Sequence, residues 1–344
     1  MMKRMKITDV RATQPSAPGM PTDWRGWMGQ IAVAVSSDDG LTGYGIGGGG
    51  AAGIHVIEAA LRPLLLGADA TDVEGLWEAM YRATLPYGRK GLAIMAMSGM
   101  DLALWDLRGK EVDKPVATLL ADEPQGDVPA YRTGGADRVA QAIADGFGAV
   151  KIGGIGRLDP ASDADAIVAL LRGVRTQVGA DVALMADAGM NWTDREAVLA
   201  LCERLAELDL GWMEEPLPAD DLDGYAWLTA RAPVPIAGGE HEFTARGFAE
   251  LMARGCHAVY QPDVCWCGGM TQLVEIYRLA RAYGVRVCPH RGSETWGLHA
   301  IAALDPQPLA ESGRPWMEWV GGREILRGRA RWTGDAGFGV TLGV

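Results

Sequence analysis

The chain has 344 residues and a formal net charge of −12, with 48% apolar and 22% charged residues. This acidic balance, without a Lys/Arg-rich stripe, argues against nucleic acid as a partner, and no run of about 18 uncharged apolar residues predicts a membrane span. The N-terminus is basic but lacks an apolar signal core, which indicates a cytoplasmic protein, and the length favours two domains.

The first predicted elements are strands at residues 3–12 and 30–37, where apolar and polar residues alternate. Residues 40–50 read GLTGYGIGGGG, which predicts turns and a glycine-rich loop. Between the strands, residues 15–29 have the Pro, Gly and Trp content of an irregular loop. Loops of this kind often close over a site.

From about residue 54 to residue 120, apolar residues recur at helical spacing. Together with the preceding strands, these helices predict an α+β capping domain over residues 1–125. Pro and Gly cluster at residues 121–130, where we expect the linker to a second domain.

Beyond the linker, short apolar runs alternate with helical segments: PAYRTG, GAVKIGG, ALMADAG, LGWMEEP, PIAGGEH, AVYQPDV, RVCPHRG and PLAES. Eight strand candidates in this rhythm predict a modified TIM barrel, (β/α)7β, over residues 126–320. Residues 321–344 are too strand-like and glycine-rich for an outer barrel helix, so we expect this segment to return to the cap.

Five of these runs end in a carboxylate or a histidine, one every 23–27 residues: Asp187, Glu214, Glu240, Asp263 and His290. The C-terminal ends of barrel strands share one mouth, so these side chains are expected to converge. A single acid more often caps a helix or pairs with an arginine, but three at consecutive strand ends favour a hard divalent cation, Mg²⁺.

The last two positions suit a general base beside such a cation. Asp263 would accept one ring N–H of His290, fix its tautomer and aim the other nitrogen into the mouth. His241 directly follows Glu240, and two roles stay open for it: facing the mouth, or only supporting its neighbour.

Lys151 ends the strand GAVK, earlier in the barrel. Its ammonium group would bind a substrate carboxylate or help to stabilise an enolate; the alternative is a surface lysine. Five cysteines show no disulfide framework and are expected to be reduced thiols. Cys265 and Cys267 form a CxC pair, but no second close pair completes a zinc site.

With these residues in place, the chain resembles the enolase superfamily, in its mandelate-racemase-like branch, over essentially its whole length. The segments that carry the resemblance are GRKGLAIMAMSGMDLALWDL, EEPLPADDLDGY, GGEHE, QPDVCWCGGMT and GFGVTL. They are most similar to the L-rhamnonate dehydratase group of sugar-acid dehydratases.

The resemblance implies that a Mg²⁺-bound carboxylate substrate loses its α-proton to a barrel base and forms a metal-stabilised enediolate. Carried over by position, the metal ligands are Asp187, Glu214 and Glu240, and the His–Asp dyad is His290 with Asp263. A later glutamate in such enzymes hydrogen-bonds the substrate carboxylate. Spacing from His299 favours Glu311 for this role, whereas Glu318 requires an insertion.

One departure bears on the reaction. The branch usually has a Lys-x-Lys pair whose second lysine is a base on the opposite face, but here the sequence is Lys151-Ile152-Gly153. Racemisation needs bases on both faces, whereas a β-elimination can run on one. His290 would then perform both proton transfers, or His241 would take one of them.

The first loop departs too, because residues 13–29 lack the histidine that rhamnonate dehydratases tend to place there. This loop offers Trp24, Arg25 and Trp27 instead. An indole and a guanidinium would contact a sugar chain or a distal carboxylate. The alternative is that the tryptophans only pack the cap against the barrel.

The sequence therefore predicts a Mg²⁺-dependent acid-sugar dehydratase, a hydro-lyase that eliminates the β-hydroxyl to give a 2-keto-3-deoxy sugar acid. The alternatives are a cycloisomerase or epimerase that uses the same enediolate, and a non-catalytic paralogue that binds a sugar acid. The expected partner is a small-molecule sugar acid, and the resemblance implies a homo-oligomer.

Overall fold

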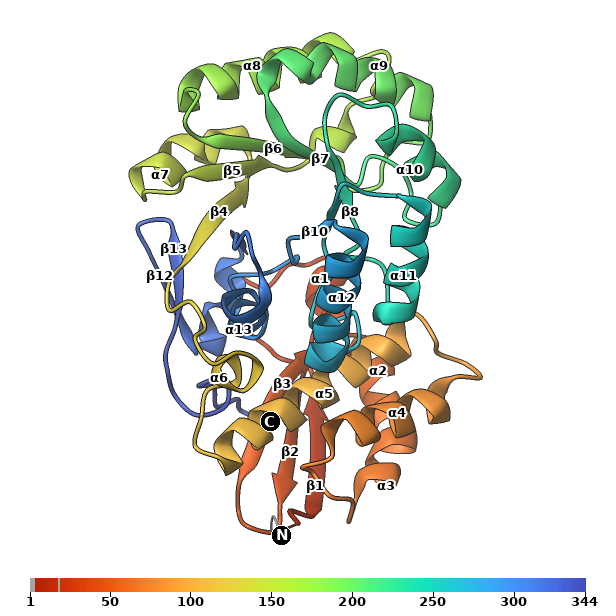
Figure 1. Ribbon diagram of the computed structural model, residues 1–344, viewed down its shortest axis with the longest axis vertical. Helices are drawn as coiled ribbons and strands as arrows, with labels where there is room; N and C mark the ends of the chain where they lie inside the picture. The colour runs from red at the N-terminus through yellow and green to blue at the C-terminus, as the bar shows by residue number, and fades with distance from the viewer. Residues whose placement is uncertain (1–3, 18) are drawn as a thin grey trace.

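The computed structural model describes residues 4–17 and 19–344. Predictions that include residues 1–3 and 18 lie, for those positions, outside the described part. Figure 1 shows a capping part at one end of the molecule, coloured red to orange, and a barrel part in yellow, green and blue. Within the described ranges, no helix is both long and apolar enough to cross a membrane.

The cap contains a three-stranded antiparallel sheet in the order β1-β2-β3, formed by Ile7–Thr13, Ile31–Ser37 and Thr42–Gly47. The two predicted strands are present as β1 and β2. The prediction of turns and loop was wrong for residues 42–47, which form β3. The loop between β1 and β2 contains a single helical turn, α1 (Trp24–Trp27), and Asp23 caps it by accepting a hydrogen bond from Arg25 N.

The glycines of β3 explain why its sequence resembles a turn. Gly43, Gly45 and Gly47 alternate along the strand against helix α5 (Leu92–Glu111). A Cβ atom at Gly45 would lie 2.3 Å from Gly99 O, and one at Gly47 would lie 2.5 Å from Met95 O. These glycines therefore allow a helix backbone to approach the sheet closely.

Helices fill the rest of the cap, as predicted for residues 54–120: α2 (Gly50–Val56), a π-helical turn (Ile57–Leu61), α3 (Arg62–Leu65), α4 (Val73–Thr84), α5 and α6 (Val116–Leu120). Helix α5 is buried on nearly all sides. It packs on β3 and also contacts the barrel helix α12 (Gly269–Tyr283), where Asp101 accepts hydrogen bonds from Thr271. This central helix couples the two parts of the molecule.

The barrel strands follow in sequence order: β4 (Val128–Gly134), β5 (Ala149–Ile152), β6 (Ala183–Asp187), β7 (Leu210–Glu214), β8 (Ile236–Gly238), β9 (Val259–Tyr260), β10 (Arg286–Val287) and β11 (Ala310–Ser312). Neighbours from β4 to β10 pair in parallel, and β11 pairs in parallel with β4. Helices alternate with the strands: α7 (Val139–Ala144), α8 (Ala164–Val178), α9 (Arg195–Leu205), α10 (Leu222–Thr229), α11 (Thr244–Arg254), α12 and α13 (Thr295–Leu304). This order is that of a (β/α)7β barrel.

The C-terminal segment contacts both parts. Strands β12 (Arg323–Leu326) and β13 (Arg329–Trp332) form a hairpin, and β13 pairs antiparallel with the start of β4. Further on, Gly337 O accepts a hydrogen bond from Val116 N, and Phe338 N donates to Asp106 in α5. The C-terminal end of the chain lies beside the cap in Figure 1.

Candidate active site

A cavity of about 500 Å³ opens between α1 of the cap and the C-terminal ends of the barrel strands. Its lining is polar on the barrel side and aromatic on the cap side: Trp24, Arg25, Gly29, Gln30, Thr133, Gly134, Gly135, Lys151, Gly153, Gly154, Arg157, Asp187, Glu240, Trp266, His290, Arg291, Glu311, Gly313, Arg314 and Trp316. Most of the predicted site residues are in this set. Glu214 and Asp263 are buried behind the wall, while His241 and Trp27 are not part of the lining.

His290 and Asp263 form the predicted pair. Nδ1 of His290 lies 2.8 Å from Asp263 Oδ2, and Asp263 is fully buried. Burial raises the pKa of Asp263, but the charge of Arg291 and the hydrogen bond from His290 lower it more, so the pKa lies below its usual value. An ionised Asp263 can only accept, so Nδ1 carries a proton, and in the neutral form of His290 it is Nε2 that presents its lone pair to the cavity. Burial lowers the pKa of His290, but the charge of Glu240 and the hydrogen bond with Asp263 raise it above its usual value.

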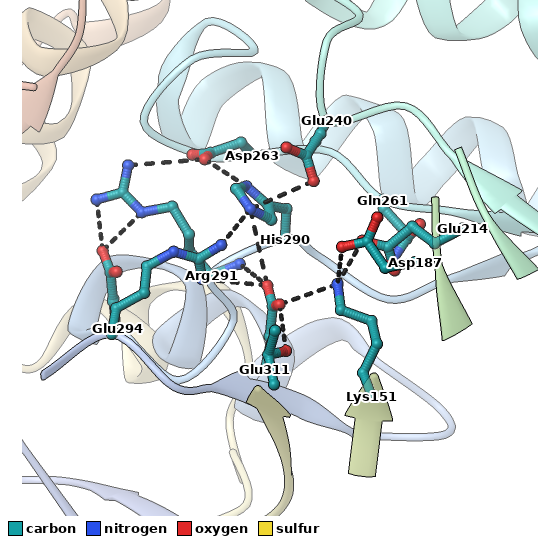
Figure 2. A network of polar contacts seen from close by, with 12 residues as sticks. Lys151, Asp187, Glu214, Glu240, Gln261, Asp263, His290, Arg291, Glu294 and Glu311 are labelled. Carbon is teal, nitrogen blue, oxygen red and sulfur yellow. Dashed lines mark hydrogen bonds and ion pairs between the residues drawn. The ribbon is translucent and has the colours of Figure 1, made fainter. Parts of the chain in front are cut away.

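Three side chains surround Nε2 of His290 on the cavity side. Oε2 of Glu240 lies 3.3 Å away and Oε2 of Glu311 lies 3.8 Å away (Figure 2). Nη2 of Arg314 is in contact with the same nitrogen. Nε2 of His290 therefore faces both the carboxylate of Glu240, a predicted metal ligand, and the guanidinium group of Arg314.

Lys151 is buried among carboxylates and is not a surface lysine. Its Nζ contacts Glu214, lies 3.0 Å from Glu311 Oε1 and lies 3.7 Å from Asp187 Oδ2 (Figure 2). Burial lowers the pKa of Lys151, but the charges of Glu214 and Glu311 outweigh this and hold the pKa well above its usual value. The ammonium group is thus permanently charged at the floor of the cavity.

Of the two late glutamates, only Glu311 lines the cavity. It accepts hydrogen bonds from Thr133 Oγ1 (2.7 Å) and Arg291 N (2.9 Å), in addition to its contacts with Lys151 and Arg314. Burial raises its pKa, but Arg314 and Lys151 lower it well below its usual value. Glu318 is 63% exposed at its side chain and pairs with Arg323.

The three predicted metal ligands lie at or just beyond the ends of the neighbouring strands β6, β7 and β8, and they influence one another electrostatically. Asp187 is in register with Glu214 across β6 and β7. Burial and the charge of Glu214 raise the pKa of Asp187 to about 7, and burial together with Glu215 and Glu214 raises the pKa of Glu240. Such mutual repulsion between oxygen ligands is what a divalent cation relieves, so the donor set fits Mg²⁺ chemically.

The most compact set of donors is a different one. In the described ranges, Glu215, Glu240 and His241 are the group of three whose ligand atoms all lie within 4.8 Å of one another. Lys151 holds Glu214 and Asp187 on the other side of the site. Glu240 therefore belongs to both clusters.

His241 pairs with Glu215, whose two oxygens lie 3.1 Å from its Nδ1, while its Nε2 lies 3.9 Å from Glu240. Burial lowers the pKa of His241, but the hydrogen bond with Glu215 and the charge of Glu240 raise it to about 9. The structure thus places this histidine between Glu215 and Glu240, outside the cavity lining.

The loop that carries α1 supplies the cap side of the cavity. The Trp24 ring lies 5.6 Å from that of Trp266, and Trp266 Nε1 donates to Gly29 O. Arg25 lines the cavity and forms an ion pair with Asp23 at 2.5 Å. Trp27 is 55% exposed and does not line the cavity.

Gly153 stands where the second lysine of the usual pair would be, and it lines the cavity. A Cβ atom there would meet no heavy atom of the described residues within 4 Å. The position is therefore open space in the cavity wall, not a position filled by another side chain.

Several residues that shape the site were not predicted from the sequence. Arg291 has a φ of 58°, donates to Glu294 Oε2 and lies 3.7 Å from Asp263. Arg314, Trp266 and Glu215 are the others. Their positions in the sequence could have pointed to them, because each lies within three residues of a residue that had been predicted to belong to the site.

Comparison with known proteins identifies the class. The profile described as the mandelate racemase/muconate lactonizing enzyme N-terminal domain matches residues 7–121, and the profile described as enolase C-terminal domain-like matches residues 135–342. The chain is 40% identical over 291 residues to the L-rhamnonate dehydratase of Saccharopolyspora erythraea, a match that covers 83% of this chain and 73% of the relative.

Two solved structures are similar over nearly the whole chain. The 3,6-anhydro-D-galactonate cycloisomerase from Zobellia galactanivorans is 28% identical with a TM-score of 0.88, covering 98% of this chain and 97% of that one. The L-talarate dehydratase from Polaromonas sp. JS666, complexed with Mg and L-glucarate, is 29% identical with a TM-score of 0.85, covering 98% and 95%.

A capped (β/α)7β barrel with these ionisable residues at the C-terminal ends of its strands defines an enzyme of the enolase superfamily. Within it, the chain belongs to the mandelate racemase/muconate lactonizing enzyme family. The predicted family and fold class are thereby confirmed.

Proposed function

We propose that this protein is a Mg²⁺-dependent acid-sugar dehydratase, a hydro-lyase that converts a sugar acid to its 2-keto-3-deoxy product. The observation that carries the proposal is the His290–Asp263 pair facing Glu240 and Lys151 across one cavity. The similarity to L-rhamnonate dehydratase supports the same reaction class.

The substrate carboxylate binds at the floor of the cavity, where Lys151 supplies a permanent positive charge. Asp187, Glu214 and Glu240 would hold Mg²⁺, which supplies further positive charge beside that carboxylate when bound. Glu311 forms ion pairs with Lys151 and Arg314 and keeps both side chains in position. It therefore acts on the substrate carboxylate indirectly, through these two cations.

His290 performs the proton transfers. Nε2 takes the proton from the α-carbon, and Asp263 stabilises the imidazolium that results. The electron pair left on the α-carbon then forms a carbon–carbon double bond as the C3–O bond breaks. The same Nε2–H protonates the departing hydroxyl, so water leaves and the enol product tautomerises to the 2-keto acid.

Gly153 supports elimination over racemisation. Racemisation requires a base on each face of the α-carbon, and glycine offers none at the position where the family resemblance implies the second lysine. A β-elimination needs a single histidine that gains a proton and returns it. His241, with its pKa raised to about 9, would be charged and is the alternative donor for the second step.

One specific observation favours a second candidate. The similarity to a 3,6-anhydro-D-galactonate cycloisomerase extends over 98% of this chain. A cycloisomerase would use the same proton abstraction and the same residues, but its product would keep the mass of the substrate.

The test is to incubate the purified protein with Mg²⁺ and a panel that contains L-rhamnonate, L-mannonate, L-talarate and 3,6-anhydro-D-galactonate. A dehydratase yields an α-keto acid and loses one water, whereas a cycloisomerase conserves mass, so mass spectrometry separates the two. His290→Asn is the control. An absence of turnover across the panel contradicts the proposal.

We further propose that the enzyme is a homo-oligomer located in the cytoplasm. The family resemblance supports the first part, and the acidic composition is compatible with the second. Light scattering of the purified protein measures the first, and a mass equal to 36.6 kDa would contradict it. Fractionation of cells that express the full chain measures the second.

A further inference from the structure

An arginine side chain contacts the nitrogen that takes the α-proton. Nη2 of Arg314 is in contact with Nε2 of His290, and its Nη1 lies 3.2 Å from Oε2 of Glu311. The Arg314 side chain lines the cavity and is 20% exposed. The other two neighbours of Nε2 are the carboxylates of Glu240 and Glu311, which only accept hydrogen bonds when ionised. Arg314 therefore supplies a hydrogen-bond donor at this nitrogen.

Two other cations of the site are engaged with different partners. The guanidinium group of Arg291 lies 3.7 Å from Asp263, the carboxylate that holds Nδ1 of His290. Nζ of Lys151 contacts Glu214. The role that remains for Arg314 is thus at Nε2, on the side of the imidazole that faces the cavity.

Arg314 keeps its own proton. Burial lowers the pKa of its guanidinium group, but the charges of Glu311 and Glu294 raise that pKa above its usual value. A guanidinium group has N–H donors and no acceptor. It can therefore hydrogen-bond a substrate oxygen and stabilise negative charge there, whereas the proton itself has to come from another residue.

The contact between Arg314 and His290 has to open before the base can act. A neutral imidazole has one lone pair at Nε2, and an N–H group of Arg314 occupies it in this structure. The α-carbon of a substrate must take the place of that N–H group. Because the ion pair with Glu311 ties Nη1, the guanidinium group can turn aside and still lie beside the reacting carbons.

After the first proton transfer, Nε2–H of His290 and Nη2–H of Arg314 are neighbouring donors. Two adjacent donors are satisfied by one acceptor with two lone pairs. The oxygen of the departing β-hydroxyl is such an acceptor, and in the proposed reaction it must reach Nε2 to receive its proton. The same oxygen therefore comes within reach of Nη2.

We propose that Arg314 is a further catalytic residue, which donates a hydrogen bond from Nη2 to the β-hydroxyl oxygen as the C3–O bond breaks. The inference rests on the proposed function and concerns its second half. The α-proton moves from C2 to Nε2 of His290, the C2 electron pair forms the C2–C3 double bond, and the C3–O pair leaves with the oxygen. The proton on Nε2 then moves to that oxygen, so water leaves and both side chains return to their starting states.

The test follows two events in D₂O, on the acid of the panel above that the wild type dehydrates fastest. NMR measures deuterium incorporated at C2 of the recovered substrate, and a colorimetric assay measures the α-keto acid. A deuteron returns to C2 when the imidazolium exchanges with solvent before the hydroxyl leaves. In Arg314→Met, α-keto acid formation should fall by about 100-fold or more, as loss of a preorganised donor predicts. Proton abstraction persists, so the ratio of deuterium incorporation to α-keto acid formation should rise by about tenfold or more.

Two conservative variants and a matched control sharpen the test. Arg314→Lys keeps a charged donor and should leave the ratio within about twofold of the wild type. Arg314→Gln keeps only a neutral donor and should raise the ratio by about threefold or more, which carries the test if Arg314→Met does not fold. Arg323→Met is the control, because Arg323 also pairs with a glutamate and is only 7% exposed at its side chain, but it lies in β12 outside the cavity. Its ratio should equal that of the wild type.

An unchanged ratio in the folded Arg314 variants would overturn the inference alone, because a side chain that only maintains the site lowers both events together. A ratio in Arg314→Lys as high as that in Arg314→Met would also overturn it. A wild type that forms no α-keto acid from any acid of the panel contradicts the proposed function itself, and this inference with it.

Discussion

Nδ1 of His290 lies 2.8 Å from Oδ2 of Asp263, and a parallel β-bridge also joins the two backbones just beyond β9 and β10. The imidazole is therefore positioned both by a side-chain hydrogen bond and by the barrel itself. Because Asp263 is buried and ionised, it selects the tautomer whose free nitrogen faces the cavity.

Asp263→Asn is expected to reduce kcat by about 10³–10⁴-fold with little change in KM, because the amide can donate to Nδ1 and stabilise the wrong tautomer. Steady-state kinetics on the best panel substrate measure it. His55, which lies in α2 away from the cavity, provides the control, since His55→Asn should retain wild-type kinetics. A decrease in KM alone would refute the assigned role.

Lys151→Met is expected to lower the free energy of unfolding of the metal-free protein by about 3 kcal/mol, because three buried or half-buried carboxylates lose their shared cation. Mg²⁺ should then raise the Tm of the variant by more than it raises that of the wild type. Thermal denaturation with and without Mg²⁺ provides the measurement. Lys114→Met, at an exposed lysine, is the control; equal Tm losses in both variants would contradict the prediction.

Substitution of Asp187 and Glu215 distinguishes the two carboxylate clusters that share Glu240. If Asp187, Glu214 and Glu240 bind the cation, Asp187→Asn should weaken Mg²⁺ binding by tenfold or more, while Glu215→Gln leaves it within about threefold. Isothermal titration calorimetry with MgCl₂ measures both. The reverse result would assign the ion to the compact cluster of Glu215, Glu240 and His241.

The stability of the protein should depend on pH through Asp101, whose pKa burial raises from 3.8 to about 7. A raised pKa means that the folded state binds the proton more tightly than the unfolded state, so this group makes stability fall as pH rises from about 4 to about 7, and adds no change above that. One pKa unit corresponds to about 1.4 kcal/mol, which limits the effect to about 4 kcal/mol.

Asp101→Asn removes this titration. The stability of the variant relative to the wild type should therefore increase between pH 5 and pH 7 in urea unfolding. A difference that stays constant across that range would mean that Asp101 is ionised throughout, held by its hydrogen bonds from Thr271.

Gly45→Ala tests why β3 is rich in glycine. A methyl group there would lie 2.3 Å from Gly99 O, so we expect a loss of about 2 kcal/mol or more in the free energy of unfolding. Gly148→Ala, whose Cβ would meet no described atom within 4 Å, should change it by less than about 0.5 kcal/mol. Urea denaturation of both variants decides between close packing and turn formation as the role of these glycines.

The barrel was predictable because its signals are local. Each apolar run is short, lies between helical segments and ends near an ionisable residue, so strand order and the approximate positions of Asp187 and Glu214 follow from the chain alone. The exact strand ends did not follow: β8, β9 and β10 stop two or three residues before Glu240, Asp263 and His290.

Strand β3 and the arginines of the site were not predictable for a different reason. The glycines of β3 are needed because a helix about fifty residues later in the sequence packs closely against the strand. The residue pattern of the strand alone does not show which helix packs on it. Arg314 and Arg291 gain their roles from Glu311, His290 and Asp263, and those contacts exist only once the barrel closes.

Strand β4 has a consequence for biosynthesis. One of its edges pairs with β5, which follows at once, but the opposite edge is shared between β11 and β13, at residues 310–312 and 329–330. While the ribosome is still making those segments, the first barrel strand has an uncovered row of amide and carbonyl groups, an open template for another nascent chain. The enzyme is therefore expected to need chaperone protection until residues 310–330 have emerged from the ribosome.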